Sequence, residues 1–243
     1  MNWFDYLLGK RRRKQAEAIS SLENFVQLVY LGEELSDEEA RKNLLDGTIE
    51  ITDAGSHSSN GLLITNDGYF LTAQHCVDGH RSRSHIVLSD GKEYQFERVC
   101  IESKKYDIAL AKAKVQEMNK KLRYKLYANH EVKEYTPITL LTRWNGKSII
   151  KSGFISSAKV DVSTAALTQS SINFKDHFTV KLTGAKKGDS GGVIASYNGR
   201  IIGLQSWVAI KPKMYELEDF NGCTKIFHAL ELVCKYVAHV KKQ

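Results

Sequence analysis

Three short motifs stand out in the chain, LTAQHC at residues 71–76, YDIAL at residues 106–110 and GDSGG at residues 188–192. Each lies at the end of a short apolar stretch that is typical of a β-strand, where loops can converge on a cleft. A serine hydroxyl is a poor nucleophile at neutral pH. It needs a base within hydrogen-bond reach, and that base needs a carboxylate that orients it and stabilises its charged form. His75, Asp107 and Ser190 supply these three residue types.

The glycines beside Ser190 have a separate chemical reason. A tetrahedral intermediate develops an oxyanion, and backbone N–H groups must point at it. Residues 188–190 can form such a concave group of amides only if the backbone adopts unusual dihedral angles, which glycine permits. Side chains at positions 188 and 192 would also obstruct an approaching peptide.

With these motifs in this order, the sequence resembles the chymotrypsin/trypsin-like serine proteases. His75 matches the TAxHC segment of that family, Asp107 its DIAL segment and Ser190 its GDSGG segment. The order His, Asp, Ser differs from that of α/β-hydrolases and subtilisins. The resemblance extends from about residue 47 to the C-terminus. It is closer to the short bacterial branches, because an IVGG-like activation sequence is absent.

The family implies a mainly β fold of two packed six-stranded antiparallel β-barrels, with a C-terminal helix and the triad between the barrels. It implies a serine endopeptidase that hydrolyses peptide bonds through an acyl-enzyme, without a metal or organic cofactor. His75 would act as general base and then general acid, Asp107 would orient it, and Ser190 would be the nucleophile. The backbone N–H groups of Gly188 and Ser190 would form the oxyanion hole. The alternative is a non-catalytic protease-fold scaffold that binds extended peptides or partner proteins.

The resemblance also implies a set of substrate-binding positions, namely Gly184, Ser206, Trp207 and Val208. The segment 204–207 resembles the strand that pairs with an extended substrate. Gly184, six residues before Ser190, occupies the position of the aspartate of trypsin-type enzymes, so a basic P1 residue is not expected. The β-branched Val208 would narrow the pocket, and we therefore expect a small or medium apolar P1 residue.

The spacing of apolar residues and turn signals along the chain predicts its domain organisation. Residues 1–46 are expected to form an N-terminal helical extension, in which Ser36 and Glu39 have the spacing of a capping box. Residues 47–243 are expected to form the protease domain. Hairpin signals are NDG at 66–68, SDG at 89–91 and YNG at 197–199. The expected parts of the protease domain are barrel 1 at about 47–125, barrel 2 at about 137–224 and the C-terminal helix at about 225–242.

The net charge of +7 comes from 35 basic and 28 acidic residues. The basic run 10–14 accounts for five of these charges, and Lys241 and Lys242 account for two, so the rest of the chain is balanced. Charge therefore gives no reason to expect a nucleic-acid partner, and a protein or peptide substrate is expected instead.

The N-terminal segment carries an apolar helix face directly before the basic run 10–14. The residues of that face are Trp3, Phe4, Leu7 and Leu8. The pattern favours packing on the protease domain, with an anionic membrane surface or a partner protein as the next alternatives. A nucleic-acid contact and an inhibitory segment removed by cleavage are further alternatives.

Cysteine usage bears on the compartment. Secreted relatives have a disulfide at Cys76, but its usual partner position, fifteen residues before His75, is Asn60. A bridge between Cys223 and Cys234 stays open as an alternative. Apolar residues precede the first basic run, unlike in a secretory signal, and no apolar run reaches the about 18 residues of a membrane span. We therefore expect reduced thiols and a cytoplasmic location, with peripheral membrane attachment as the alternative.

Overall fold

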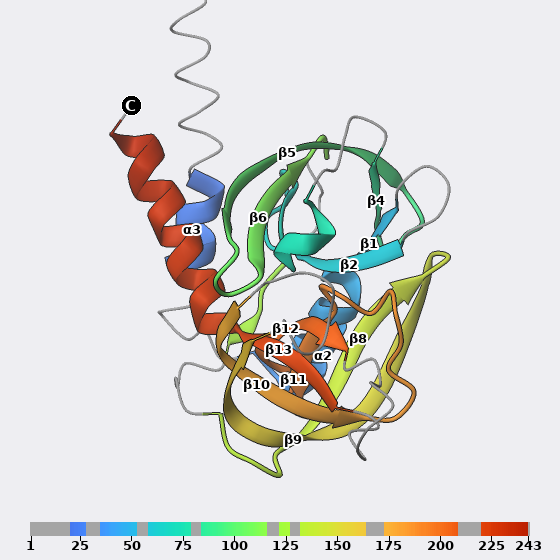
Figure 1. Cartoon of the computed structure of the whole chain (residues 1–243). Helices are drawn as coiled ribbons and strands as arrows, with labels where there is room; N and C mark the ends of the chain where they lie inside the picture. The colour runs from blue at the N-terminus through green and yellow to red at the C-terminus, as the bar shows by residue number, and fades with distance from the viewer. Residues whose placement is uncertain are drawn as a thin grey trace, which may run out of the picture.

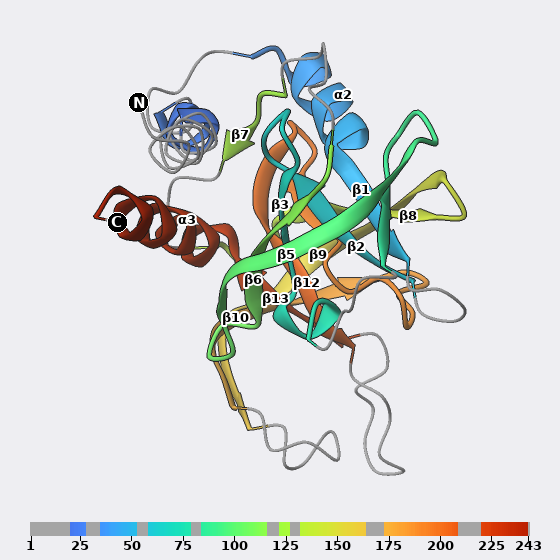
Figure 2. The same cartoon turned by 90° about the horizontal axis from the view of Figure 1, so that it is seen from above.

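The computed structural model describes most of the chain (Figures 1 and 2), namely residues 20–27, 35–52, 58–78, 84–115, 122–126, 132–163, 173–208 and 220–242. For residues 161–163, 173–175, 207, 208 and 220 it describes the main chain only. Figure 1 shows two barrels packed one above the other, with a long C-terminal helix along one side.

The first barrel is a closed six-stranded antiparallel sheet in the order β1-β2-β3-β6-β5-β4. Its strands are β1 (Thr48–Thr52), β2 (Ser58–Leu63), β3 (Tyr69–Thr72), β4 (His85–Val87), β5 (Glu93–Ser103) and β6 (Ile108–Ala113). The predicted turns at 66–68 and 89–91 join β2 to β3 and β4 to β5. Gly68 and Gly91 have φ of +99° and +80° there, which a glycine adopts without the strain of a side chain. These two hairpin predictions are confirmed, and so is the third, because the turn at 197–199 joins the antiparallel β11 (Val193–Ser196) and β12 (Arg200–Val208).

The second barrel contains six strands in the order β11-β8-β9-β10-β13-β12, and the pairing of β11 with β12 closes it. Its strands are β8 (Pro137–Trp144), β9 (Lys147–Ser163), β10 (Asn173–Leu182), β11 (Val193–Ser196), β12 (Arg200–Val208) and β13 (Phe220–Lys225). The short β7 (Lys125–Leu126) adds to β12 as a parallel strand. The predicted mainly β fold of two six-stranded barrels is therefore confirmed, and β7 is an addition to it.

Each barrel has its own apolar interior. Phe70, Leu71 and Leu110 are fully buried in the first cluster, and Phe178 and Val180 are fully buried in the second. Burial of each such side chain stabilises the fold by roughly 1.5–3 kcal/mol relative to exposure. The two cores hold the strand ends, and therefore the loops of the site, in fixed positions.

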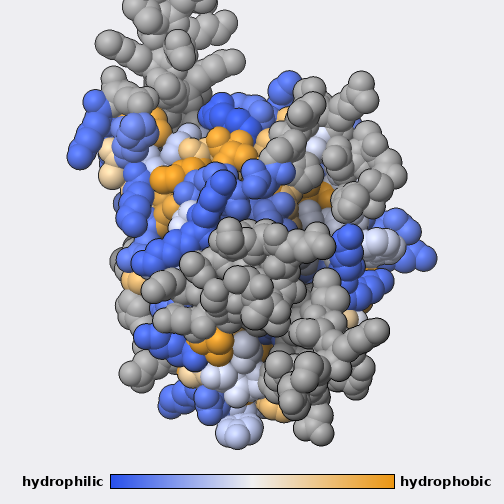
Figure 3. All heavy atoms as spheres, in the orientation of Figure 1, coloured by the Kyte–Doolittle hydropathy of each residue, from blue (hydrophilic) through white to orange (hydrophobic). Residues whose placement is uncertain are grey.

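Helices flank the barrels at both ends of the chain. In α2 (Asp37–Gly47) the Ser36 side chain accepts a hydrogen bond from the Glu39 N–H, and the Glu39 carboxylate accepts one from the Ser36 N–H, so the capping-box prediction is confirmed. The C-terminal α3 (Ile226–Lys241) packs on β5, β6 and β12. On the face seen in Figure 3, apolar residues gather beside α3 over β5 and β6, with hydrophilic residues around them.

Residues 20–27 form a further helix beside α3 (Figure 2). Leu22 and Phe25 of this helix are buried in the same cluster as the interior of the first barrel. Lys241 at the end of α3 forms an ion pair with Glu23. Within residues 1–46 the structure thus describes a helix at residues 20–27 and most of α2, and the helix at residues 20–27 packs on the body of the protein.

The buried Arg143 on β8 joins the two barrels. Its guanidinium donates hydrogen bonds to the carbonyl oxygens of Thr48 at 3.0 Å and Leu45 at 3.1 Å, which belong to β1 and α2. It also donates to Gly146 O at 2.8 Å in the turn between β8 and β9. Arg143 therefore connects β8 of the second barrel to β1 of the first barrel and to α2.

Candidate active site

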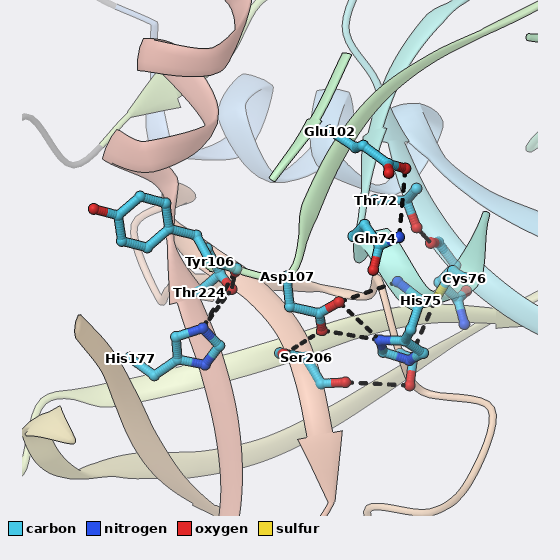
Figure 4. A network of polar contacts seen from close by, with 12 residues as sticks. Thr72, Gln74, His75, Cys76, Glu102, Tyr106, Asp107, His177, Ser206 and Thr224 are labelled. Atoms are coloured by element: carbon cyan, nitrogen blue, oxygen red, sulfur yellow. Dashed lines mark hydrogen bonds and ion pairs between the residues drawn. The ribbon is translucent and has the colours of Figure 1, made fainter. Parts of the chain in front are cut away.

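His75 and Asp107 come together because β3 pairs with β6. The register places Thr72 opposite Ala109, so the loop after β3 and the loop before β6 meet at the same end of the barrel. His75 lies on the short 3-10 helix η1 (Gln74–Cys76), and its Nδ1 is 2.9 Å from Asp107 Oδ2 (Figure 4). The His75 backbone N–H also donates to Asp107 Oδ1 at 3.1 Å. The carboxylate therefore fixes both the backbone and the ring of His75.

Ser206 on β12 supplies a second partner for the carboxylate. The Ser206 Oγ donates a short hydrogen bond to Asp107 Oδ2 (Figure 4). Asp107 is only 2% exposed, yet its oxygens have donors from both barrels. Burial alone would raise the pKa of Asp107, but the hydrogen bonds from His75 and Ser206 outweigh burial and lower it. Asp107 is therefore held as a carboxylate.

The same contact acts on His75 in the opposite direction. Burial of the imidazole disfavours its charged form, but the hydrogen bond to Asp107 and the nearby Cys76 sulfur outweigh burial and raise the pKa of His75. A base with a raised pKa accepts a proton more readily than a free imidazole. Asp107 therefore stabilises the imidazolium form of His75.

Asp107 has an unusual backbone, which the second barrel supports. Its φ of +49° lies in the left-handed region that non-glycine residues rarely adopt. The preceding carbonyl, that of Tyr106, accepts a short hydrogen bond from Thr224 Oγ1 and lies 3.2 Å from His177 Nε2 (Figure 4). The His228 ring stacks on Tyr106 with ring centres 3.8 Å apart. Residues of β13, β10 and α3 therefore hold the turn that carries Asp107 in place.

Ser190 lies in a loop where glycines permit close approach of the backbone. Gly191 has φ of +78°, and its N–H donates to Gln205 O at 2.7 Å. The Ser190 Oγ contacts Ser206 O at 3.5 Å. Among the described residues, no hydrogen bond joins Ser190 Oγ to His75, so Ser206 is the residue that links Ser190 to the Asp107 pair.

The turn before Ser190 directs two amides away from the protein's own acceptors. The Asp189 N–H donates to Lys186 O at 3.1 Å, and Gly188, at the third position of this turn, has φ of +100°. A positive φ at that position is the mark of a type II turn. Neither the Gly188 N–H nor the Ser190 N–H has a hydrogen-bond partner within the described part of the chain. These are the two donors expected of an oxyanion hole.

Asp189, between these two residues, is held by a lysine. Lys151 on β9 forms an ion pair with Asp189 Oδ2, and the Lys186 N–H donates to the same oxygen at 2.7 Å. The side chains of Lys151 and Asp189 are 9% and 3% exposed. Buried charges need such a partner. The carboxylate of Asp189 is therefore engaged and does not face solvent.

Cys76 lies on the other side of the imidazole. Its Sγ is 3.7 Å from His75 Nε2, the ring nitrogen that does not face Asp107. All four cysteines are free thiols, including Cys223 and Cys234. The position of the missing disulfide partner, Asn60, is buried and bonds to the loop of Ser190.

The predicted substrate-binding positions differ in what surrounds them. Ser206 is fully buried. Gly184 is exposed, with φ of +71° and no atom within 4 Å of a side-chain carbon built on it. Trp207 and Val208 lie in β12, but their side chains are outside the described part. So are residues 1–19, which include the apolar face and the basic run 10–14.

Two further observations concern metal sites and membrane-spanning helices. Within the described ranges, no three His, Cys, Asp or Glu side chains gather as metal ligands would. None of the helices there combines the length and apolar character that crossing a membrane requires.

Sequence reasoning missed two residues that hold the loop of Ser190. Asn60 was considered only as the position of an absent cysteine, and Lys151 was not considered at all. Lys151 has no motif around it, and the strand β9 alone brings it to Asp189. A sequence can reveal a buried lysine only when it stands alone as a charged residue in a strand whose other residues alternate between apolar and polar.

Comparison with known proteins agrees with this fold. Two solved structures of Rv3671c resemble the chain, each with a TM-score of 0.62 and 16% identity. One is a serine-to-alanine mutant of the protein from M. tuberculosis H37Rv in an inactive form, matched over 82% of this chain and 90% of that one. The other is the protease in an inactive form, matched over 81% and 92%. No curated protein matches. The family model of the trypsin-like peptidase domain matches residues 59–204, more than half of the chain, and the protein therefore belongs to that family.

Proposed function

We propose that the protein is a serine endopeptidase with Ser190 as nucleophile, His75 as general base and acid, and Asp107 as the carboxylate that orients His75. The observation that carries this proposal is the contact of 2.9 Å between His75 Nδ1 and Asp107 Oδ2. It lies beside a serine whose loop has two amides without a hydrogen-bond partner among the described residues. The contact fixes the tautomer in which His75 Nε2 can accept a proton.

In the proposed reaction, the Ser190 Oγ attacks the carbonyl carbon of the scissile peptide bond. Its proton passes to His75 Nε2, and Asp107 stabilises the resulting imidazolium. The N–H groups of Gly188 and Ser190 donate to the oxyanion of the tetrahedral intermediate. His75 then protonates the leaving amine, an acyl-enzyme forms at Ser190, and water releases the acyl group by the reverse sequence.

This reaction requires the Ser190 Oγ to turn from Ser206 O toward His75 Nε2. The contact of 3.5 Å with Ser206 O is long for an O–H···O hydrogen bond, so little energy opposes the rotation. Hydrogen bonds between a nucleophile and its base often tighten only when substrate binds.

We further propose a small or medium apolar P1 residue. Gly184 provides no countercharge for a basic side chain, and the nearby carboxylate of Asp189 is already paired with Lys151. A basic P1 group would therefore be desolvated without a partner, which is unfavourable.

The proposal is tested with a fluorophosphonate probe, which reacts with activated serines. Wild-type protein should be labelled at Ser190, and Ser190→Ala should not be labelled. A peptide library should then yield cleavage after small or medium apolar residues. Binding of extended peptides without labelling or turnover would replace the proposal with the non-catalytic scaffold.

A further inference from the structure

Cys76 and His75 hold two metal-binding groups close together. They are consecutive residues of η1, and the Cys76 Sγ lies 3.7 Å from His75 Nε2 (Figure 4). Cys76 is a free thiol and is 4% exposed. The proposed reaction uses the imidazole of His75 but not this sulfur. A cysteine sulfur and a histidine nitrogen are both ligands that Zn²⁺ binds in proteins.

The distance between the two atoms fits a shared zinc ion. Zinc lies about 2.3 Å from a thiolate sulfur and about 2.0–2.1 Å from an imidazole nitrogen, and its ligands are arranged as a tetrahedron. Two such ligands are therefore about 3.5–3.6 Å apart. The observed 3.7 Å needs the angle at the ion to open by less than about 10°. One ion can therefore contact both atoms with almost no movement of either side chain.

The other ring nitrogen of His75 is already arranged as in a metal site. A histidine that binds a metal through one ring nitrogen almost always donates its other N–H to a carboxylate, a carbonyl or water. His75 Nδ1 faces Asp107 Oδ2 at 2.9 Å, so Nε2 is the nitrogen that carries the lone pair. Nε2 contacts Cys76 Sγ, and among the described residues no hydrogen bond joins it to Ser190 Oγ. The lone pair that a cation would use is therefore next to the sulfur.

The backbone of η1 holds both ligands in place. The His75 N–H donates to Asp107 Oδ1 at 3.1 Å, and the Cys76 N–H donates to Ala73 O at 3.0 Å. Ligands that are fixed in advance bind a metal more tightly, because less conformational freedom is lost on binding. The side chain of His75 is 39% exposed, so an ion can reach the pair from the imidazole although the thiol is buried.

We propose that Cys76 Sγ and His75 Nε2 bind one Zn²⁺ ion and that this ion inhibits the protein reversibly. The thiol proton is released to solvent when the ion binds, because the thiolate is the ligand. The ion then occupies the lone pair of Nε2, so His75 cannot accept the proton of Ser190. The binding depends on the two ligands alone, whereas the inhibition rests on the proposed peptidase function.

The number of protein ligands makes the zinc ion exchangeable. Structural zinc sites have four protein ligands, and catalytic sites have three and a water molecule. Within the described ranges no third His, Cys, Asp or Glu side chain completes a metal site with this pair. Water therefore fills the remaining positions, and the ion is bound more weakly than in a structural site. Such binding suits an inhibitor that is removed again rather than a permanent cofactor.

Cobalt provides a test that does not need activity. Co²⁺ accepts the same ligands as Zn²⁺, and a bond to a thiolate gives it an absorption band in the near ultraviolet. Reduced wild-type protein titrated with Co²⁺ should develop this band, and Zn²⁺ should abolish it. Cys76→Ala should lose the band. In His75→Ala the band should need at least about tenfold more Co²⁺, since the loss of even a residue behind a ligand costs about 10- to 100-fold in metal affinity. Cys100→Ala is the matched control and should keep the band, because it removes another free thiol, on β5.

The second readout is the effect of zinc on labelling by the fluorophosphonate probe. Zn²⁺ should slow the labelling of wild-type protein, and a chelator should restore the rate. In Cys76→Ala the concentration of Zn²⁺ that gives half inhibition should rise at least about tenfold. Each protein is compared with itself in the absence of metal, so a change in the basal rate of the variant does not affect the result.

A thiolate band that is absent at millimolar Co²⁺, or that is unchanged in Cys76→Ala or in His75→Ala, would overturn the zinc site. Half inhibition at the same Zn²⁺ concentration in Cys76→Ala and in wild-type protein would overturn it as well. If Cys76→Ala does not fold, the titration of His75→Ala decides the site. If metal-free wild-type protein is not labelled at all, the proposed peptidase function fails, while the cobalt spectra still decide whether the pair binds a metal.

Discussion

Lys151 places its ammonium group on the carboxylate of Asp189, one residue before Ser190, and both side chains are buried. The two residues are 38 positions apart. Asp189 lies between the two residues whose N–H groups are the proposed oxyanion donors. Its carboxylate also accepts a hydrogen bond from the Lys186 N–H, so the side chain is held at both Lys151 and Lys186. A lysine from within the chain thus stabilises the loop of Ser190.

Lys151→Met should therefore impair both stability and activity. The substitution leaves Asp189 buried without its charge partner, which costs about 3–5 kcal/mol. Urea denaturation measures this loss, and fluorophosphonate labelling at a temperature where the variant is folded measures the loss of activity. Lys112→Met is the control, because its partner Asp67 is about a third exposed and the pair is far from the loop of Ser190. A loss in Lys151→Met no larger than that in Lys112→Met would contradict this account.

Ser206→Ala should weaken catalysis without unfolding the protein. The change removes the donor to Asp107 Oδ2, so the pKa of Asp107 rises and the carboxylate stabilises the imidazolium of His75 less well. We expect kcat to fall by about tenfold, the size of one charge-assisted hydrogen bond. Steady-state kinetics on a cleaved peptide measures kcat, and Ser156→Ala, which removes a hydroxyl bonded to Thr179 on the second barrel, is the control. Equal kcat values for Ser206→Ala and the control would show that Ser206 does not act on Asp107.

The buried His177 should make stability depend on pH. Burial lowers its pKa to about 4, from 6.5 in the unfolded chain, although the charge of Asp107 opposes the change. Below pH 6.5 the unfolded state therefore binds a proton that the folded state does not. Stability should fall as pH falls from 6.5 to about 4, by roughly 3 kcal/mol in total.

Urea denaturation at pH 7, 6 and 5 measures this dependence, and His177→Gln should have a smaller slope over the same range. The slope, rather than the stability of either protein, is the quantity compared, because the substitution changes packing as well. His75 is present in both proteins, so the contribution of its raised pKa cancels when the two slopes are compared. Identical slopes would mean that His177 is not kept neutral by the fold.

Gly191→Ala should abolish activity, for steric reasons. A Cβ at Gly191 would lie 1.8 Å from Asn60 O, so either β2 or the loop of Ser190 must move. Gly91→Ala is a matched control, because Gly91 also has positive φ, +80°, but has no atom within 4 Å of the added carbon. The control should cost about 1–2 kcal/mol of strain and keep its activity. Labelling of both variants at the wild-type rate would mean that the close approach is not needed.

Local signals in the sequence predicted hairpins and a mainly β chain, and the resemblance to the family implied the two six-stranded barrels. The turns at 66–68 and 89–91 and the capping box at Ser36 are short-range patterns, in which the residues that interact lie within a few positions of one another. The strand register could not be predicted from alternation, because β1, β3 and β6 are buried along nearly their whole length. The short strand β7 could not be predicted, because two residues carry no periodicity.

The candidate site could be predicted only in part. The three motifs identify His75, Asp107 and Ser190, but the residues that support them come from distant strands and have no motif. In the sequence, Asn60 only marks a position where secreted relatives have a cysteine. In the structure, its side chain donates a hydrogen bond to Gly188 O and so connects the two barrels. His177 and His228 have no motif around them in the sequence, and β10 and α3 bring them to Tyr106, the residue before Asp107.

The central claim is that Ser190 becomes acylated. The most direct measurement is the intact mass of the protein after brief reaction with a peptide ester, followed by fragmentation to locate the acyl group. We predict one acyl group per chain on Ser190 in wild-type protein and none in Ser190→Ala. An acyl group on Cys76, whose sulfur lies 3.7 Å from His75 Nε2, or no acyl group on any residue, would contradict the assignment of Ser190 as the nucleophile.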